Sequence, residues 1–484
     1  MLLRGSLYGI AFLLCLVVVA NIRSPRIRQL VLLLASCGLY LTWTRWFFAV
    51  LLTSTVMNFL LGRALRRNQS GALLATGILL NLILLSTFKY VPAIAVAMPF
   101  SSVQRFAHLA LPLGISFWTF QAMSYLFDLY RGEELDPSFV EFALYMAFFP
   151  VTISGPICRM PDMLPQFRSN NPIPWESVGR GFQRIAMGVL MMLFARLLGQ
   201  GILAGDGINS GFDQATHWSG LDVWCLAFGY GLQLFFDFAG YSHIAIGAAQ
   251  ALGLIVPENF AQPFQSTTPS IFWTRWHMSL SFWIRDYVFL PLATVRREIW
   301  WRNLALVISM VLFGLWHKAT ILFLLWGAYH GLLLVAHRQI QQAKRRFDWE
   351  PRTFWWTPLS WLVTIVCVSL GWIFFRANSL SEAGTMLSAL VSPATYGAHF
   401  LSGSLYLLVT GLSLGYAIVS MVAQAISGTT EGASPENVRG RITSLAARWR
   451  WYWLLPLYTV ALLFVLMVTL TRGTSTAQFM YGNF

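Results

Sequence analysis

The sequence predicts an all-α protein that crosses a membrane many times. Of its 484 residues, 57% are hydrophobic and only 11% are charged, unlike ordinary soluble domains. Apolar runs without strict alternation recur along the chain, and several approach the ~20 residues that a spanning helix needs, so helices are predicted in place of a β-barrel. We expect about eleven crossings plus re-entrant segments. The clearest runs are 7–20, 30–41, 47–61, 72–85, 354–375, 405–425 and 453–470.

The placement of the positive charge predicts orientation. The net charge is +14, and the basic residues cluster in short connections at 23–28, 63–67, 296–302, 338–346 and 439–450. By the positive-inside rule these loops face the cytoplasm. Contact with anionic lipid or an anionic soluble donor is a weaker explanation of the charge, and we expect no nucleic-acid partner. The five scattered cysteines form neither a disulfide framework nor a CxxC metal site, so no metal is expected.

The N-terminal part reads as membrane helices. Residues 1–21 resemble a signal peptide, but the stronger basic cluster follows them, so we expect a retained first helix with the N-terminus outside. A tight turn at 42–46 then returns the chain to the cytoplasmic loop at 63–67.

Two segments that follow are irregular. The run 111–132 opens with Pro112 and Gly114 and carries Asp128, which leaves two readings open: a broken, partly inserted helix, or a plain helix whose polar residues pack against neighbours. Residues 148–167 hold four prolines and one glycine, which predicts a re-entrant or interfacial segment.

Four arginines lie in this irregular segment or shortly after it, and one aspartate stands out beyond them. Arg159, Arg168, Arg180 and Arg184 either hold a phosphorylated donor or mark a cytoplasmic loop. Helices are expected near 182–203 and 223–236. Beyond the second, Asp237 is either the partner of an arginine, the better explanation, or a site residue.

The stretch 271–331 is the expected working site, because three histidines lie in otherwise membrane-like sequence. A charge at a helix centre costs roughly 2.5–3.5 kcal/mol on insertion scales, so such groups mark function. In the first expected helix of this stretch, Trp273, Trp276, His277 and Leu280 would share a face, with Trp276 and Trp283 walling a pocket around His277.

The basic loops at 296–302 and 338–346 place both ends of the intervening apolar segment in the cytoplasm, so this segment enters the membrane and returns to the same side. The apex of this excursion therefore lies near 316–320, where His317 is located.

The C-terminal part is predicted to contain a helix to 375, an amphipathic segment at 380–390 and a helix over 405–425. A hydrophilic cytoplasmic stretch at 427–450 precedes the last helix, so the C-terminus should face outside. We find no internal repeat and no soluble domain. The chain is expected to be one membrane-embedded domain, divided into N-terminal helices (1–70), a core (71–376) and C-terminal helices (377–484).

Two chemistries suit imidazoles at this depth. One is general acid–base catalysis, since an ordinary histidine pKa of about 6.5 lies close to operating pH; the other is metal or haem ligation, for instance by His317 and His330. A lone membrane histidine is most often a packing residue, and three in sixty residues weaken that explanation without removing it.

Five motifs, in order, resemble the membrane-bound O-acyltransferases: 111–132, 148–167, 236–247, 272–291 and 314–331. The resemblance is greatest to the bacterial branch of the alginate O-acetylation membrane protein and the D-alanyl transfer protein of teichoic acids, and it covers about 29–376. It implies about eleven membrane helices with re-entrant pieces, funnelled from outside toward a thin central partition. In that family the histidine of the Gly-Leu-Trp-His motif is catalytic, which maps onto His317. The His or Asn of the Arg-Trp-His motif maps onto His277.

The resemblance implies an O-acyltransferase of the bacterial inner membrane that moves an acetyl group from a cytoplasmic thioester, acetyl-coenzyme A, to an extracytoplasmic polysaccharide. His317 would be the general base. His277 would orient the acyl group or stabilise the oxyanion, and Trp276 and Trp316 would wall the tunnel against water. His330, Lys318 and Tyr241 are expected beside the substrates. Relatives in this branch often pass the acyl group to an extracytoplasmic SGNH-type partner with a serine nucleophile. No tightly bound cofactor is implied.

Two departures from the family pattern concern the substrate. The usual Gly-Tyr-Ser-Asp reads Gly-Tyr-Ser-His243, and the usual Trp-His-Gly reads Trp-His317-Lys318. A lysine beside the histidine would place a cation at the site, where it would lower the imidazole pKa or attract an anion. The competing hypothesis from another class is a transporter or lipid-linked-sugar flippase, because polar groups in broken helices also mark transport sites. The absence of an inverted repeat weighs against it.

Overall fold

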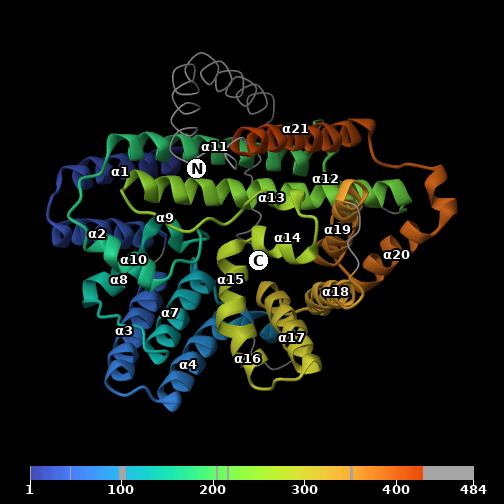
Figure 1. The fold of residues 1–484 in the computed structure, drawn as a ribbon. Coiled ribbons are helices and arrows are strands. Elements are labelled where there is room, and N and C mark those ends of the chain that lie inside the picture. The colour runs from blue at the N-terminus through green and yellow to red at the C-terminus, as the bar shows by residue number, and fades with distance from the viewer. Residues whose placement is uncertain are drawn as a thin grey trace.

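The described part of this computed structural model consists of helices without strands (Figure 1). It comprises residues 2–43, 45–97, 105–202, 205–214, 217–348 and 353–428. The predicted hydrophilic stretch at 427–450, apart from its first two residues, and the predicted last helix at 453–470 lie outside it.

The N-terminal half of the chain alternates long and short helices. Its elements are α1 (Leu2–Asn21), α2 (Pro25–Trp43), α3 (Arg45–Arg67), α4 (Gly71–Lys89), α5 (Val91–Ala97), η1 (Arg105–His108), α7 (Ile115–Tyr130), α8 (Phe139–Ala147), α9 (Phe149–Thr152), α10 (Met160–Phe167), α11 (Trp175–Gln200) and α12 (Ile208–Gln214).

The second half begins with the longest described helix. Its elements are α13 (Gly220–Ala251), η2 (Pro263–Gln265), α14 (Pro269–Arg275), α15 (Met278–Ile284), the π-helical turn η3 (Arg285–Phe289), α16 (Leu290–Thr294), α17 (Ile299–His317), α18 (Ile321–Arg346), α19 (Thr353–Arg376), α20 (Leu380–Val391), η4 (Pro393–Gly397) and α21 (Gly403–Gly428).

Seven of the described helices are long and apolar enough to cross a membrane: α3, α4, α11, α13, α17, α18 and most of α19. Shorter apolar helices add to them at Tyr8–Asn21, Leu380–Val391 and Gly403–Val419. The all-α, multi-pass prediction is therefore confirmed. The number of about eleven crossings and the division of the chain at residues 70 and 376 stay predictions.

Most of the irregular segments agree with the sequence predictions. Residues 148–167 form two short helices, α9 and α10, separated by a non-helical stretch that contains Pro156, which cannot donate a backbone hydrogen bond. Pro150 and Pro161 lie in the first turns of these helices, where a missing N–H costs little. The run 111–132 forms the plain helix α7, which begins only after Gly114 takes the left-handed conformation. The apex expected near 316–320 is the three-residue connection between α17 and α18.

Helices α11 and α13 run alongside each other across the upper part of the molecule, while α3, α4, α7 and α17 lie below them (Figure 1). Glycines allow their close approach. A Cβ on Gly181 would lie 2.6 Å from the Gly247 carbonyl oxygen, and one on Gly240 would lie 2.7 Å from the Gly188 oxygen. Small residues at such crossings are typical of membrane helix pairs.

Gly240→Ala is therefore expected to destabilise the protein by about 1–3 kcal/mol, because the added methyl group would clash with backbone that cannot move independently. Thermal unfolding in detergent measures the effect. Gly179→Ala on α11 is the matched control, since its Cβ would meet nothing within 4 Å. Equal melting temperatures for the two variants would contradict the tight crossing.

A second glycine crossing fixes the position of His317. A Cβ on Gly314 would lie 2.2 Å from the Phe323 carbonyl oxygen, and one on Gly327 would lie 2.3 Å from the Met310 oxygen. The backbones of α17 and α18 thus touch one turn before His317, which places its imidazole against rings of both helices. The glycine of the Gly-Leu-Trp-His motif has this structural role.

Candidate active site

His317 ends α17 inside an aromatic enclosure. Its side chain is only 4% exposed. The imidazole centroid lies 4.6 Å from that of Trp316, 5.3 Å from Phe313 in a stacked arrangement, 5.2 Å from Phe375 and 5.7 Å from Trp326. Aromatic rings from α17, α18 and α19 therefore surround a single polar group, which limits the access of water.

His330 lies one element further along, on the other side of Trp326. Its ring is 5.0 Å from Trp326 and 5.2 Å from Trp273, and neither ring nitrogen has a hydrogen-bond partner among the described residues. A Cβ on Gly371 would lie 2.4 Å from its Nε2, so α19 presses directly on the imidazole. Because His317 and His330 both pack against the indole of Trp326, this arrangement favours packing over haem ligation. The described residues contain no cluster of three metal-ligating side chains.

The predicted shared helix face from Trp273 to Leu280 is wrong. Helix α14 ends at Arg275, and His277 adopts a left-handed backbone conformation (φ 44°) before α15 begins at Met278. A non-glycine residue in this conformation is strained, and such strain clusters at functional sites. The break turns His277 away from the face that a continuous helix would have given it.

Asn259 compensates for this break. It is fully buried and its main-chain oxygen accepts a hydrogen bond from the Met278 N–H. Its side-chain Oδ1 accepts from the N–H and the hydroxyl of Ser279, and lies 3.1 Å from His277 Nδ1. A backbone N–H can only donate, so it fixes which amide atom is the oxygen.

It follows that His277 donates its Nδ1–H to Asn259. In the neutral imidazole the lone pair is then on Nε2. His277 is 1% exposed, packs edge-on against Phe238 at 4.6 Å, and lies close enough to His317 for an electrostatic interaction. The structure thus brings together the two histidines that the sequence singled out.

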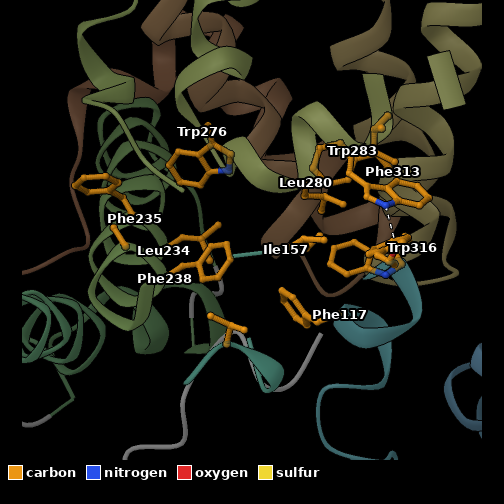
Figure 2. Close-up of a cluster of buried hydrophobic side chains, with 14 of the residues drawn as sticks. Phe117, Ile157, Leu234, Phe235, Phe238, Trp276, Leu280, Trp283, Phe313 and Trp316 are labelled. Atoms are coloured by element: carbon orange, nitrogen blue, oxygen red, sulfur yellow. Dashed lines mark hydrogen bonds between the residues drawn. The ribbon is translucent and has the colours of Figure 1, made fainter. Parts of the chain in front are cut away.

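Figure 2 shows how the tryptophans divide the site. Trp276 lies with Phe235 and Phe238 on one side, and Trp316 lies with Phe313 and Phe117 on the other. Trp283, expected to wall a pocket around His277 together with Trp276, packs on Phe120 at 4.4 Å and donates its indole N–H to the Phe120 carbonyl oxygen. Trp276 instead packs on Trp372 of α19 at 5.0 Å.

Four buried indole N–H groups in this region have no hydrogen-bond partner among the described residues: those of Trp273, Trp316, Trp326 and Trp372. Buried donors are almost always satisfied, and each orphan needs a reason. Three of these indoles pack against His317 or His330. Such a cluster of unsatisfied donors is typical of a site where substrate or water completes the hydrogen bonds.

The two lysines near His317 are placed differently from what the sequence suggests. Lys318 is exposed at the end of α17. Lys89, which ends α4, is partly buried, and its ammonium lies 4.7 Å from the centroid of the Trp316 ring. Sequence reasoning missed Lys89, although one signal could have found it: this lysine follows closely on the apolar run 72–85, where a charge is costly.

The remaining site candidates lie around α13. Tyr241 is directed toward the backbone of Ser154 in the irregular 148–167 segment. His243 accepts a hydrogen bond from Arg184 Nε, and Arg184 also pairs with Glu258. Asp237 is buried within α13.

The four arginines in and shortly after the irregular segment are ion-paired: Arg159 with Asp286, Arg168 with Glu141, Arg180 with Glu176 and Arg184 with Glu258. This favours a structural role over the binding of a phosphorylated donor. Burial alone would raise the pKa of Asp286, but hydrogen bonds from Arg285 and Arg159 outweigh burial and hold that pKa below its ordinary value.

Asp286→Asn is expected to lower the free energy of unfolding by about 1.5–3 kcal/mol at neutral pH, because Arg159 loses its charged acceptor. A carboxyl group whose pKa is lower in the folded state than in the unfolded state stabilises the fold when the pH is above the unfolded-state pKa. This stabilisation is lost as the pH falls through the folded-state pKa. The gap between wild type and variant should therefore narrow on acidification, as measured by denaturant unfolding in detergent. A difference in unfolding free energy that stays constant with pH would contradict this prediction. The control is Asp136→Asn, which breaks a more exposed pair with Arg66 and should change the free energy of unfolding little.

The fold and this interior define a multi-pass membrane protein with an enzyme-like histidine site enclosed by its helices. The chain belongs to the membrane-bound O-acyltransferase family, MBOAT, whose model matches residues 30–375. It is therefore an O-acyltransferase, and the bacterial inner membrane fits the bacterial origin of its relatives.

Curated relatives from three groups are similar to this chain. The probable alginate O-acetylase AlgI of Pseudomonas putida is 32% identical over 482 residues, which is 95% of each chain. The peptidoglycan O-acetyltransferase of Helicobacter pylori is 31% identical over 79% of this chain and 77% of its own length. The teichoic acid D-alanyltransferase of Bacillus subtilis is 30% identical over 55% of this chain and 69% of its own length.

Proposed function

We propose that this enzyme transfers an acetyl group from a cytoplasmic thioester, acetyl-coenzyme A, through the membrane interior to an extracytoplasmic polysaccharide or to an SGNH-type partner that acylates it. The observation that carries the proposal is the enclosure of His317 by aromatic rings at the end of α17, with His277 buried against Phe238 in the same interior. Acetylation is favoured over D-alanylation because the similarity to the acetylating relatives covers 79–95% of the chain, against 55% for the D-alanyltransferase.

His317 acts as the general base on the acceptor hydroxyl. The position is suitable because α17 ends there, at the apex of an excursion that begins and ends in the cytoplasm. The proposal requires that a donor from the cytoplasm and an acceptor from outside both reach this position. Such proton transfer contributes typically ~10²–10⁴ to a rate.

His277 orients a substrate group and does not stabilise the oxyanion. Its Nδ1–H is donated to Asn259, so the neutral ring presents a lone pair and no second N–H. A lone pair can hold a donor such as a hydroxyl or an amide N–H, whereas an oxyanion needs a donor. Between the two roles considered from the sequence, the hydrogen bonds favour orientation.

The tryptophans keep water from the thioester. Trp276 and Trp316 are 5% and 9% exposed and lie on opposite sides of the cluster in Figure 2. Excluding water limits hydrolysis and strengthens electrostatic interactions within the site. The unpartnered indole N–H of Trp316 supports its expected contact with substrate. His330 supports the enclosure through Trp326.

The test uses purified protein in lipid nanodiscs with acetyl-coenzyme A labelled on the acetyl group. Transfer of label to an acidic polysaccharide or to an SGNH-type protein, or release of labelled acetate, is the expected result. Vesicles that accumulate a lipid-linked sugar without any acetyl transfer would instead favour the transporter alternative. Comparing alginate with peptidoglycan as acceptor identifies the polysaccharide.

A further inference from the structure

The partly buried cation over the Trp316 ring has no role in the reaction as described so far. Lys89 ends α4, and its ammonium lies 4.7 Å from the centre of the Trp316 ring, whose neighbour in sequence and space is His317. The hydroxyl of Tyr90 donates a hydrogen bond to the Leu315 carbonyl oxygen at 3.1 Å, which ties this end of α4 to the last turn of α17. His317 also interacts electrostatically with Lys89.

Lys89 has no carboxylate partner within the described structure. None of the seven ion pairs there includes it, and its attraction to the Trp316 ring is the contact that orients it. An ammonium at this depth without a carboxylate is costly, and ionisable groups in such places are typically functional. A developing negative charge would offset that cost.

Acyl transfer produces such a charge and needs a donor for it. Attack on a thioester creates a tetrahedral intermediate with an oxyanion, and a donor fixed in a water-poor site contributes most to its stabilisation. Neither histidine is suited to this, since His317 receives the proton and His277 presents a lone pair. Lys89 is the cation already in place.

We propose that Lys89 is a catalytic residue whose ammonium stabilises the oxyanion of the acyl-transfer intermediate, with the indole N–H of Trp316 as a second donor. This inference rests on the proposed function.

In the step, the acceptor hydroxyl gives its proton to His317, and its oxygen forms a bond to the thioester carbonyl carbon. The carbonyl π electrons move to oxygen, which pairs with Lys89. The intermediate then collapses, the C–S bond breaks, and the thiolate takes the proton from His317.

The experiment compares Lys89→Met with wild type in labelled acetyl transfer. A fall in kcat of about 10²–10³ at every pH, with KM changed by less than about threefold, is expected. Lys89→Arg keeps the charge and should recover part of kcat. A kcat for Lys89→Met within threefold of wild type would overturn the proposal.

Two further outcomes separate the role of Lys89 from that of His317. If activity of Lys89→Met returns to wild type as the pH rises, Lys89 acts through His317 and does not contact the oxyanion. If His317→Ala keeps full turnover, the base assignment fails while Lys89 is still judged by its own variant.

Matched controls separate the chemistry from folding. Lys344 also lies over an indole, 4.2 Å from the centre of Trp356, so Lys344→Met removes an equivalent cation–π contact outside the site and should keep kcat. Thermal unfolding of each variant in detergent reports stability. A loss of kcat in Lys344→Met equal to that in Lys89→Met would overturn the proposal.

Discussion

Replacing His317 with alanine is expected to reduce acetyl transfer by about 10²–10⁴, because the acceptor hydroxyl then has no general base in a site closed to water. The aromatic enclosure makes the loss severe: no other titratable ring stacks on Phe313 and Trp316 at the end of α17 among the described residues. Turnover of labelled acetyl-coenzyme A in nanodiscs measures it, with kcat determined at saturating donor and acceptor.

His337→Ala is the matched control. His337 lies on α18 outside the enclosure, bonded to Ser270 at 2.9 Å and to Gln341 at 3.1 Å, and its loss should leave kcat close to wild type. The kcat of His330→Ala should lie between those of His317→Ala and His337→Ala, since His330 packs against Trp326. Unchanged turnover in His317→Ala would remove this histidine from the chemistry and leave the family assignment intact.

Asn259→Leu is expected to reduce kcat by a factor on the order of 10²–10⁴. The upper end is the effect of replacing the aspartate that fixes the tautomer of the catalytic histidine in serine proteases. Leucine cannot accept from His277 Nδ1, so the ring loses both its orientation and its fixed tautomer. The protein should also be destabilised by about 1–3 kcal/mol for each buried donor left unsatisfied. Steady-state kinetics and thermal unfolding on the same preparation separate the two effects.

Asn81→Leu controls for the loss of a buried amide. Asn81 and Asn58 exchange hydrogen bonds at 2.7 and 3.1 Å between α3 and α4, so this variant should lose stability while keeping kcat. Asn259→Asp retains an acceptor for Nδ1 and should recover much of the activity that Asn259→Leu loses. If both Asn259 variants behave like Asn81→Leu, Asn259 is a purely structural residue.

Much of the fold was predictable because lipid imposes simple rules. A backbone in hydrocarbon must satisfy its own hydrogen bonds, so apolar runs become helices whatever their neighbours. Prolines in 148–167 predicted interruption for the same reason, since each removes a donor. The close crossings at Gly240 and Gly314 were not predicted, because a glycine is required there only by the backbone of the neighbouring helix, which the sequence alone does not reveal.

The candidate site was only partly predictable. The apex position of His317 followed from the basic loops alone, because charge placement depends on local sequence. The geometry of His277 did not follow, because Asn259, eighteen residues away, holds its strained backbone and its tautomer. A helical-face argument considers only neighbours three and four residues apart, so it could not include that contact.

The sequence by itself determined the class of protein, the position of His317 at the turn between two helices and the family motifs, since composition, charge and motif order belong to the chain. Only the tertiary structure decided which lysine lies at the site. Lys318 is adjacent to His317 in sequence but exposed, whereas Lys89 reaches Trp316 from a helix more than two hundred residues earlier. The physical reason is a contact between segments distant in the sequence: the Tyr90 hydroxyl donates a hydrogen bond to the Leu315 carbonyl oxygen and holds the end of α4 against the last turn of α17.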